Sequence, residues 1–343
     1  MSTRALLRRS REAKAWLLDA MVPLWSQASL ERAGGVAAAL DLNHRPLADD
    51  PGSDPLAAIR LAAAFARIRR LDPENSAIAR SLEGFLGDTL GGPEASTLVA
   101  RAGWLLAHGL SAGEVDASVA KPALPGAARA IIDAAHDQAT RLVAGKAFKA
   151  AGLPTWLDAC LVLARVDPTG GHTGRASSLA AALTNDIGSA PCQLFVRADE
   201  PVDIADQFNW SWRMAAHADS IGAAWPVESQ ALFAFAAAAQ DEDGSVPKLV
   251  TQDGTKIDAS LTLDAQAAAL MAHLSQLRVD PAPQIGAAAR DSFDAIMDTH
   301  LTPEGGWIAN YTAEGLPADQ QIAARHADTI ARALVSLIDT MAA

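Results

Sequence analysis

The sequence GSVPKLVTQDGTKI at residues 244–257 combines a leading glycine, a short β-prone run, an Asp-Gly pair and a short return. Asp-Gly is a strong hairpin signal, because the turn requires backbone angles with positive φ. The stretches GGVAAALDLNHRPL at 34–47 and GGWIANYTAEGLP at 305–317 align with it, with turns at Asn-His and Glu-Gly. A weaker copy, CQLFVRADEP, occupies 192–201. The chain therefore contains a recurrent hairpin.

Alanine-rich segments with apolar residues three and four positions apart surround these hairpins, and alanine is the best helix former. The first such segment is expected to end before Pro23, since proline lacks the N–H that a helix interior needs. The spacing predicts twelve helices, at 4–21, 55–70, 74–84, 95–108, 127–147, 154–164, 175–183, 204–218, 226–240, 261–277, 285–300 and 319–341.

Repetition of one supersecondary unit along a chain indicates a repeat architecture. Twelve helices punctuated by one hairpin predict six helical hairpins closed into a ring, an all-α (α/α)6 barrel formed by a single domain over 1–343, with β-hairpins in the loops at one end. The alternative is an open superhelix of similar pairs, but open arrays usually have a shorter and more regular period. Loops at one end of a ring converge on a central pocket, where functional residues are expected.

Composition limits the classes of partner. The formal net charge is −12, which argues against nucleic acid and anionic membranes, because both require a basic surface. Cys160 and Cys192 form no C-x-x-C pair, so neither a disulfide framework nor a metal knuckle is expected, as in a reducing cytoplasm. The histidines have no metal-ligand spacing, and the longest apolar run, 231–239, is shorter than the ~20 residues of a membrane span. We expect a cytoplasmic protein without a metal.

The stretch DQFNWSWRM at residues 206–214 opens a predicted helix with an acid, an amide and two indoles close together. Only 5% of the residues are aromatic, so this cluster is a candidate binding surface. Indole faces stack on the C–H faces of a sugar, whose hydroxyls take polar partners. The alternative is that both tryptophans enter the core.

Further landmarks follow one another along nearly the whole chain. They are WLLD at 16–19, PLW at 23–25, GG at 34–35, Arg60 five residues before FA at 65–66, QFNWSW at 207–212, GGW at 305–307 and RH at 325–326. In order and spacing they resemble the N-acylglucosamine 2-epimerase family, whose relatives include mannose isomerases and cellobiose 2-epimerases.

The resemblance implies an (α/α)6 barrel and proton transfer beside a sugar carbonyl without a cofactor. Removal of that proton leaves an enediolate, so the site needs a base and a group that stabilises the oxyanion. Histidine suits the base because its pKa lies near working pH. His326 matches the family's final histidine and Arg60 matches its arginine, whereas the alternatives are a structural histidine and an ordinary surface arginine.

Other positions depart from the family pattern. Asp206 stands where the family has a histidine, Asn209 where it has a glutamate, and Asp158 where another pocket histidine is found. The DAQAA stretch at 264–268 lacks the acid of the family's W-P-Q-x-E helix. The candidate catalytic residues are His326, Arg60 and Asp206. The candidate substrate-binding residues are Trp210, Asn209, Trp307, Asp158 and Trp25.

The leading hypothesis is a divergent isomerase or epimerase of a mannose- or N-acylglucosamine-type sugar, with a homodimer left open. A single histidine favours isomerisation, because epimerisation needs proton delivery to both faces of a carbon. A second hypothesis is a glycoside hydrolase with Asp158 and Asp206 as acid and base. Asp206 alternatively caps its helix. A third hypothesis is a carbohydrate-binding relative without activity.

Overall fold

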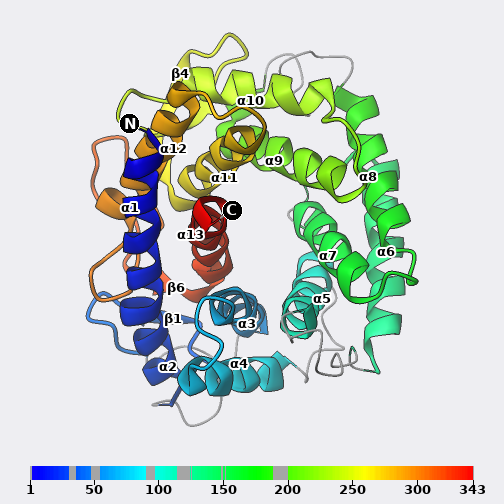
Figure 1. Cartoon of the computed structure of the whole chain (residues 1–343), viewed down its shortest axis with the longest axis vertical. Helices are drawn as coiled ribbons and strands as arrows, with labels where there is room; N and C mark the ends of the chain where they lie inside the picture. The colour runs from blue at the N-terminus through cyan, green and yellow to red at the C-terminus, as the bar shows by residue number, and fades with distance from the viewer. Residues whose placement is uncertain are drawn as a thin grey trace.

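Two concentric rings of helices make up the computed structural model (Figure 1). It describes residues 2–30, 36–47, 55–89, 97–113, 124, 126–147, 150, 152–187 and 200–342. The inner ring runs in chain order, and its last helix returns to pack on its first. Its members are α3 (Pro55–Arg69), α5 (Leu98–Gly113), α7 (Gly152–Val166), α9 (Ile204–Ser220), α11 (Leu263–Val279) and α13 (Ala327–Ala342).

Each inner helix has an outer partner that packs against it. The outer helices are α4 (Ser76–Thr89), α6 (Ala128–Ala144), α8 (His172–Ile187), α10 (Val227–Ala239), α12 (Pro283–Ala295) and a continuous helix of α1 (Ser2–Ala15), η1 (Trp16–Met21) and α2 (Val22–Leu30). The described part of the chain thus holds twelve long helices in six pairs. The (α/α)6 prediction is confirmed, and the open superhelix is wrong, since α13 contacts α3.

Small residues let the inner helices approach closely. A Cβ atom on Gly103 of α5 would lie 2.7 Å from Ile59 of α3, and one on Gly109 would lie 2.9 Å from Val162 of α7. Both distances are shorter than real carbon contacts, so a larger residue at either position would force the neighbouring side chain to shift. The inner helices are buried on most of their surface because the outer helices cover them.

The expectation that the first helix ends before Pro23 is wrong. The backbone N–H of Val22 reaches the carbonyl of Leu17, which is the longer hydrogen bond of a π-turn. This wider turn shifts the register just before Pro23, where an α-helix would suffer a missing N–H and a steric clash. The helix therefore continues through Pro23 and carries Trp25 into the core.

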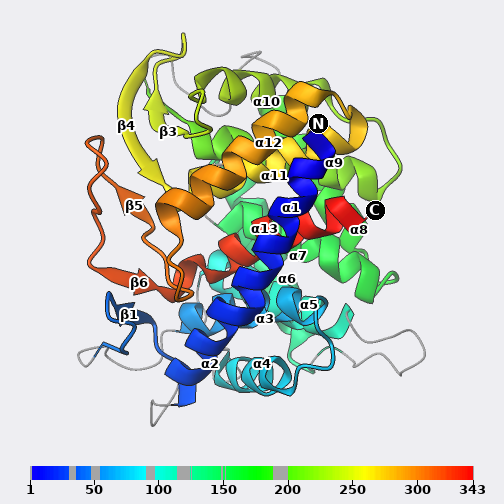
Figure 2. The same cartoon turned by 60° about the vertical axis from the view of Figure 1, so that its left-hand side comes forward.

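Short strands occupy loops that lead from an outer helix into the next inner helix, and Figure 2 shows them together at one side. In one pair, β1 (Ala39–Asp41) is antiparallel to β6 (Gln321–Ala323). An antiparallel sheet has the order β2 (Val202–Asp203), β3 (Pro247–Val250), β4 (Lys256–Thr262) and β5 (Asn310–Tyr311).

The predicted turns are confirmed where the structure describes them. His44, Gly254 and Gly315 all have positive φ, at 65°, 87° and 77°, as hairpin turns require. The glycines at 34–35 and the weaker copy up to residue 199 lie outside the described residues. The last helix begins at Ala327 rather than near 319, because Gln321–Ala323 pairs with β1 instead. Within the described ranges, no helix combines the length and apolar character that a bilayer crossing requires.

Candidate functional site

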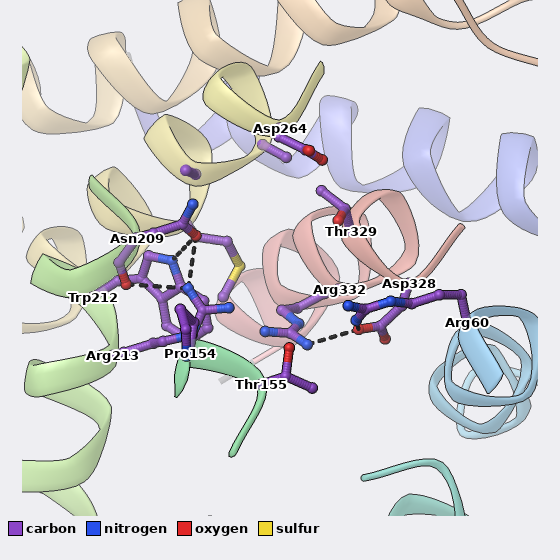
Figure 3. Close-up of a pocket in the computed structure, with 13 residues that line it drawn as sticks. Arg60, Pro154, Thr155, Asn209, Trp212, Arg213, Asp264, Asp328, Thr329 and Arg332 are labelled. Carbon is purple, nitrogen blue, oxygen red and sulfur yellow. Dashed lines mark hydrogen bonds and ion pairs between the residues drawn. The ribbon is translucent and has the colours of Figure 1, made fainter. Parts of the chain in front are cut away.

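A cavity of about 230 Å3 lies where several inner helices begin. Its lining comes from the first ten residues of α3, α7, α9, α11 and α13, so the positive ends of these helix dipoles surround it. Figure 3 shows the polar side chains converging from four sides. The lining residues are Arg60, Pro154, Thr155, Asn209, Trp212, Arg213, Asp264, Ala267, Ala268, Met271, Asp328, Thr329 and Arg332.

Asp158 of α7 anchors two arginines of this site. Arg213 donates from Nε to Oδ1 at 3.0 Å and from Nη2 to Oδ2 at 2.9 Å, and Arg332 donates from Nη1 to Oδ2. All three residues are more than nine-tenths buried. Burial acts to raise the pKa of Asp158, but the charges and hydrogen bonds of both guanidinium groups outweigh it and lower that pKa. Asp158 is therefore ionised and fully engaged.

Asp328 at the start of α13 plays the same part for a second set of arginines. Its Oδ1 accepts from Nε of Arg67 at 2.7 Å, and its Oδ2 accepts from Nη2 of Arg332 at 2.7 Å. Arg60 lies 3.8 Å from Oδ2. Burial acts to raise the pKa of Asp328, but these cations lower it far below its usual value. Arg332 thus bridges Asp158 and Asp328.

Trp212 forms the apolar wall of the cavity. The guanidinium of Arg213 lies 4.2 Å from its ring centroid and that of Arg332 lies 5.6 Å away, within the range of cation–π attraction. The Oδ1 atom of Asn209 accepts from Arg213 Nη1 at 2.7 Å and from Trp212 Nε1 at 3.4 Å. The ring and the amide hold the arginines in fixed positions.

Asp264 of α11 forms a second polar group at the edge of the cavity. Nδ1 of His326 lies 3.2 Å from Oδ1 of Asp264, while Nε of Arg325 donates to Nε2 of His326 at 3.1 Å. These partners assign the neutral tautomer with the proton on Nδ1 and the lone pair on Nε2. Burial acts to raise the pKa of Asp264, but the hydrogen bond and charge of His326, and the charge of Arg60, lower it.

The structure brings together several of the residues singled out in the sequence. Arg60 and Asn209 line the cavity, and Asp158 contacts two lining arginines. His326 is 8% exposed and is not itself a lining residue, but its partner Asp264 is. The functional roles expected for these residues stay predictions.

The expected stacking tryptophans lie in the core instead. Trp25 and Trp307 stack on each other with ring centroids 5.1 Å apart and an interplanar angle of 22°. Both are fully buried, and Trp210 is 1% exposed. Their rings are covered by neighbouring side chains, so they offer no free face to a sugar. The tryptophan that does line the cavity is Trp212.

Asp206 lies in the first turn of α9 and is not among the lining residues. The residue that caps this helix is Asp203, whose Oδ1 accepts from the backbone N–H of Ala205 at 2.8 Å. The cap expected at Asp206 is therefore wrong by three positions. Because two arginines hold Asp158 ionised, it is not suited to the acid role of a hydrolytic pair with Asp206, and this pair stays a prediction.

Sequence reasoning missed Arg213, Arg332 and Asp328. A local signal was present, since Asp328 and Arg332 are four residues apart, the orientation that favours an ion pair along a helix. Asn209 and Arg213 have the same spacing. Among the described residues, no group of histidine, cysteine and acidic side chains has the geometry of a metal site.

The comparisons with known proteins place this fold. No protein-family model and no curated protein matches the chain. The structure is similar to a cellobiose 2-epimerase from Bacillus thermoamylovorans B4167 (TM-score 0.76, 16% identity, 96% of this chain and 98% of that chain). A D-mannose isomerase is similar as well (TM-score 0.76, 12% identity, 98% and 97%). So is an unsaturated glucuronyl hydrolase from Bacillus sp. GL1 (TM-score 0.63, 13% identity, 93% and 96%). The chain shares its fold with these sugar epimerases, isomerases and hydrolases.

Proposed function

We propose that the chain is an enzyme that transfers a proton beside the carbonyl of a small aldose or ketose, with His326 as the base. The observation that carries the proposal is the contact between His326 Nδ1 and Asp264 Oδ1, at the edge of a cavity lined by arginines. A carboxylate on Nδ1 orients the imidazole and stabilises the imidazolium that forms when Nε2 takes a proton.

The reaction that this arrangement supports is an aldose–ketose isomerisation. Nε2 of His326 takes the proton from the carbon beside the carbonyl, and the electrons of the broken C–H bond move onto the carbonyl oxygen. Cations at the cavity, Arg60 among them, stabilise the resulting oxyanion. The proton of the neighbouring hydroxyl moves to this oxyanion, and return of the abstracted proton to the former carbonyl carbon completes the isomerisation. The exposed Arg325 must leave Nε2 first, which frees its guanidinium for a substrate oxygen.

The size of the cavity and the contact of one histidine with a lining carboxylate support this reaction over its relatives. A cavity of about 230 Å3 is smaller than the roughly 300–1,000 Å3 of most ligand pockets, which favours a monosaccharide. No histidine is among the described lining residues, and His326 is joined to the cavity through Asp264. One base can move a proton between adjacent carbons on one face, whereas epimerisation needs delivery to both faces.

The test is hydrogen exchange with solvent. Wild-type protein in heavy water is incubated with mannose, fructose, glucose, N-acetylglucosamine, N-acetylmannosamine and their 6-phosphates and uronic acids, and NMR follows deuterium entry beside the carbonyl. We expect exchange on at least one sugar, its loss in His326→Gln, and its retention in His136→Gln on the outer helix α6. Exchange that survives in His326→Gln rejects the assignment. Release of reducing ends without exchange indicates a hydrolase, and binding without either reaction indicates a carbohydrate-binding protein.

A further inference from the structure

The charged groups at the cavity do not balance. Among the described residues, four guanidinium groups face three carboxylates, namely Arg60, Arg67, Arg213 and Arg332 against Asp158, Asp264 and Asp328. Asp264 also shares its charge with His326 and is the one carboxylate whose side chain is half exposed, at 51%. The cluster therefore carries at least one excess positive charge, and two when His326 is protonated.

Buried charge without a partner is costly, because it loses its hydration shell. Two features of the cavity add to this cost. The Nε atom of Arg332 is buried and has no hydrogen-bond partner within the described part of the chain. In addition, α9, α11 and α13 all begin at the cavity, which adds the positive ends of their dipoles. A ligand that carries a negative charge removes this imbalance, whereas a neutral ligand leaves it in place.

Arg60 is the arginine best placed to receive such a charge. Arg213 is fixed by Asp158 and Asn209, and Arg332 is fixed by Asp158 and Asp328. Among the residues that the structure describes, Arg60 makes only the long 3.8 Å ion pair with Asp328, and its side chain is 18% exposed. Its planar fork of donors can turn toward an oxyanion without breaking a hydrogen bond, and such forks bind carboxylates and phosphates in pairs of contacts.

We infer that this cavity binds an acidic monosaccharide, whose carboxylate, phosphate or sulfonate group contacts Arg60 and Arg332. The hydroxyl groups of Thr155 and Thr329 line the same cavity and suit the neutral oxygens of the sugar. With the acid group at Arg60, the other end of the sugar is turned toward Asp264 and His326. This orientation rests on the proposed function, whereas the binding of the acid group does not.

Isothermal titration calorimetry at low salt tests the inference. The ligands are glucuronate, glucose 6-phosphate, a glucose 6-sulfonate, glucose as the neutral match, and inorganic phosphate. We expect at least one acidic sugar to bind about 10- to 100-fold more tightly than glucose, as charge-assisted hydrogen bonds imply. Arg60→Gln should abolish this preference, and Arg60→Lys should keep part of it. Arg129→Gln, on an exposed side chain of α6, should leave it unchanged.

Several outcomes overturn the inference. Equal affinity for glucose and all acidic sugars would show that the acid group adds nothing to binding. Equal affinity for inorganic phosphate and glucose 6-phosphate would show that the cavity binds the anion and not the sugar. A preference for acidic sugars that persists in Arg60→Gln would show that Arg60 does not bind the acid group. His326→Gln separates the two proposals, since it should bind the acidic sugar as the wild type does. Exchange on neutral sugars alone overturns this inference but keeps the proposed function. Arg60-dependent binding of an acidic sugar without any hydrogen exchange keeps this inference but overturns the proposed function.

Discussion

The imidazole of His326 contacts the carboxylate of Asp264 at 3.2 Å, across 62 residues of sequence. The contact joins the residue just before α13 to the start of α11, and these two helices are neighbours in the inner ring. Asp264 lines the cavity, whereas His326 is not a lining residue and is almost covered. The two residues therefore connect the binding cavity to the only histidine that the family resemblance assigns as a base.

Asp264→Asn should reduce activity without unfolding the protein. The amide keeps the size of the side chain but removes the charge that stabilises a protonated His326. We expect the rate of solvent exchange on the accepted sugar to fall about 100- to 10,000-fold, as for other disabled acid–base pairs. Asp253→Asn, at the exposed tip of the β3–β4 hairpin, is the matched control. A wild-type rate in Asp264→Asn would exclude the carboxylate from the reaction.

Local sequence signals were sufficient for the turns and the ring of helices. Gly254 and Gly315 mark turns because glycine, which has no Cβ atom, adopts positive φ without steric cost. The π-turn before Pro23 was missed, because the shift from one hydrogen-bond register to another leaves no mark in composition. The resemblance to a family indicated where residues stand in the chain, but it did not show that Trp25 and Trp307 stack in the core.

The charged site depends on contacts that sequence spacing cannot reveal. Arg332 and Asp158 are separated by 174 residues, so their pairing exists only once the ring has closed. The sequence makes Asp158 a candidate substrate-binding residue or one of a hydrolytic pair, because it stands where the family has a pocket histidine. Its two guanidinium partners come from α9 and α13. No pattern in the sequence of either helix predicts that its arginine faces inward.

Asp158→Asn should destabilise the fold strongly. The amide leaves Arg213 and Arg332 buried without a carboxylate, and removal of one partner from a buried ion pair costs about 3–5 kcal/mol. Urea unfolding near pH ~7 measures the change, with Asp133→Asn on the surface of α6 as the control. Because the folded pKa of Asp158 is lowered, its contribution is complete above its unfolded pKa of about 3.9 and is lost as pH falls through the folded value. The difference between wild type and variant should shrink in that acidic range, and a constant difference would contradict it.

His273 should make the fold sensitive to mild acid. It is buried against Phe208 and Phe233, and burial lowers its pKa to about 4. The unfolded chain binds a proton near pH ~6.5 and the folded chain does not, so stability falls as pH decreases between these values. The expected loss between about pH 6.5 and 5 is about 2 kcal/mol for this residue.

His273→Asn isolates this effect. The asparagine amide can replace the hydrogen bond from Nδ1 to the carbonyl of Ala269, but it does not titrate. The variant will be less stable at neutral pH because it leaves a gap beside two phenylalanines. Its free energy of unfolding should nevertheless vary less with pH than that of wild type over this range. The other buried histidines whose pKa is lowered by burial, His108, His172, His217 and His300, contribute to the slope that remains. If the free energy of unfolding varied identically with pH in both proteins, groups other than His273 would cause the whole pH dependence.

Gly305→Ala tests how tightly the hairpin loops dock on the outer helices. Gly305 has φ of +93°, and a Cβ atom there would lie 2.4 Å from the backbone of Ala20 in η1. Gly254 has nearly the same φ, +87°, but open space around it. Alanine at Gly254 should therefore cost about 1–2 kcal/mol from left-handed backbone strain alone. Alanine at Gly305 adds a backbone clash and should cost at least about 2 kcal/mol more. Equal losses at the two sites in urea unfolding would mean that the loop shifts away from the π-turn without cost.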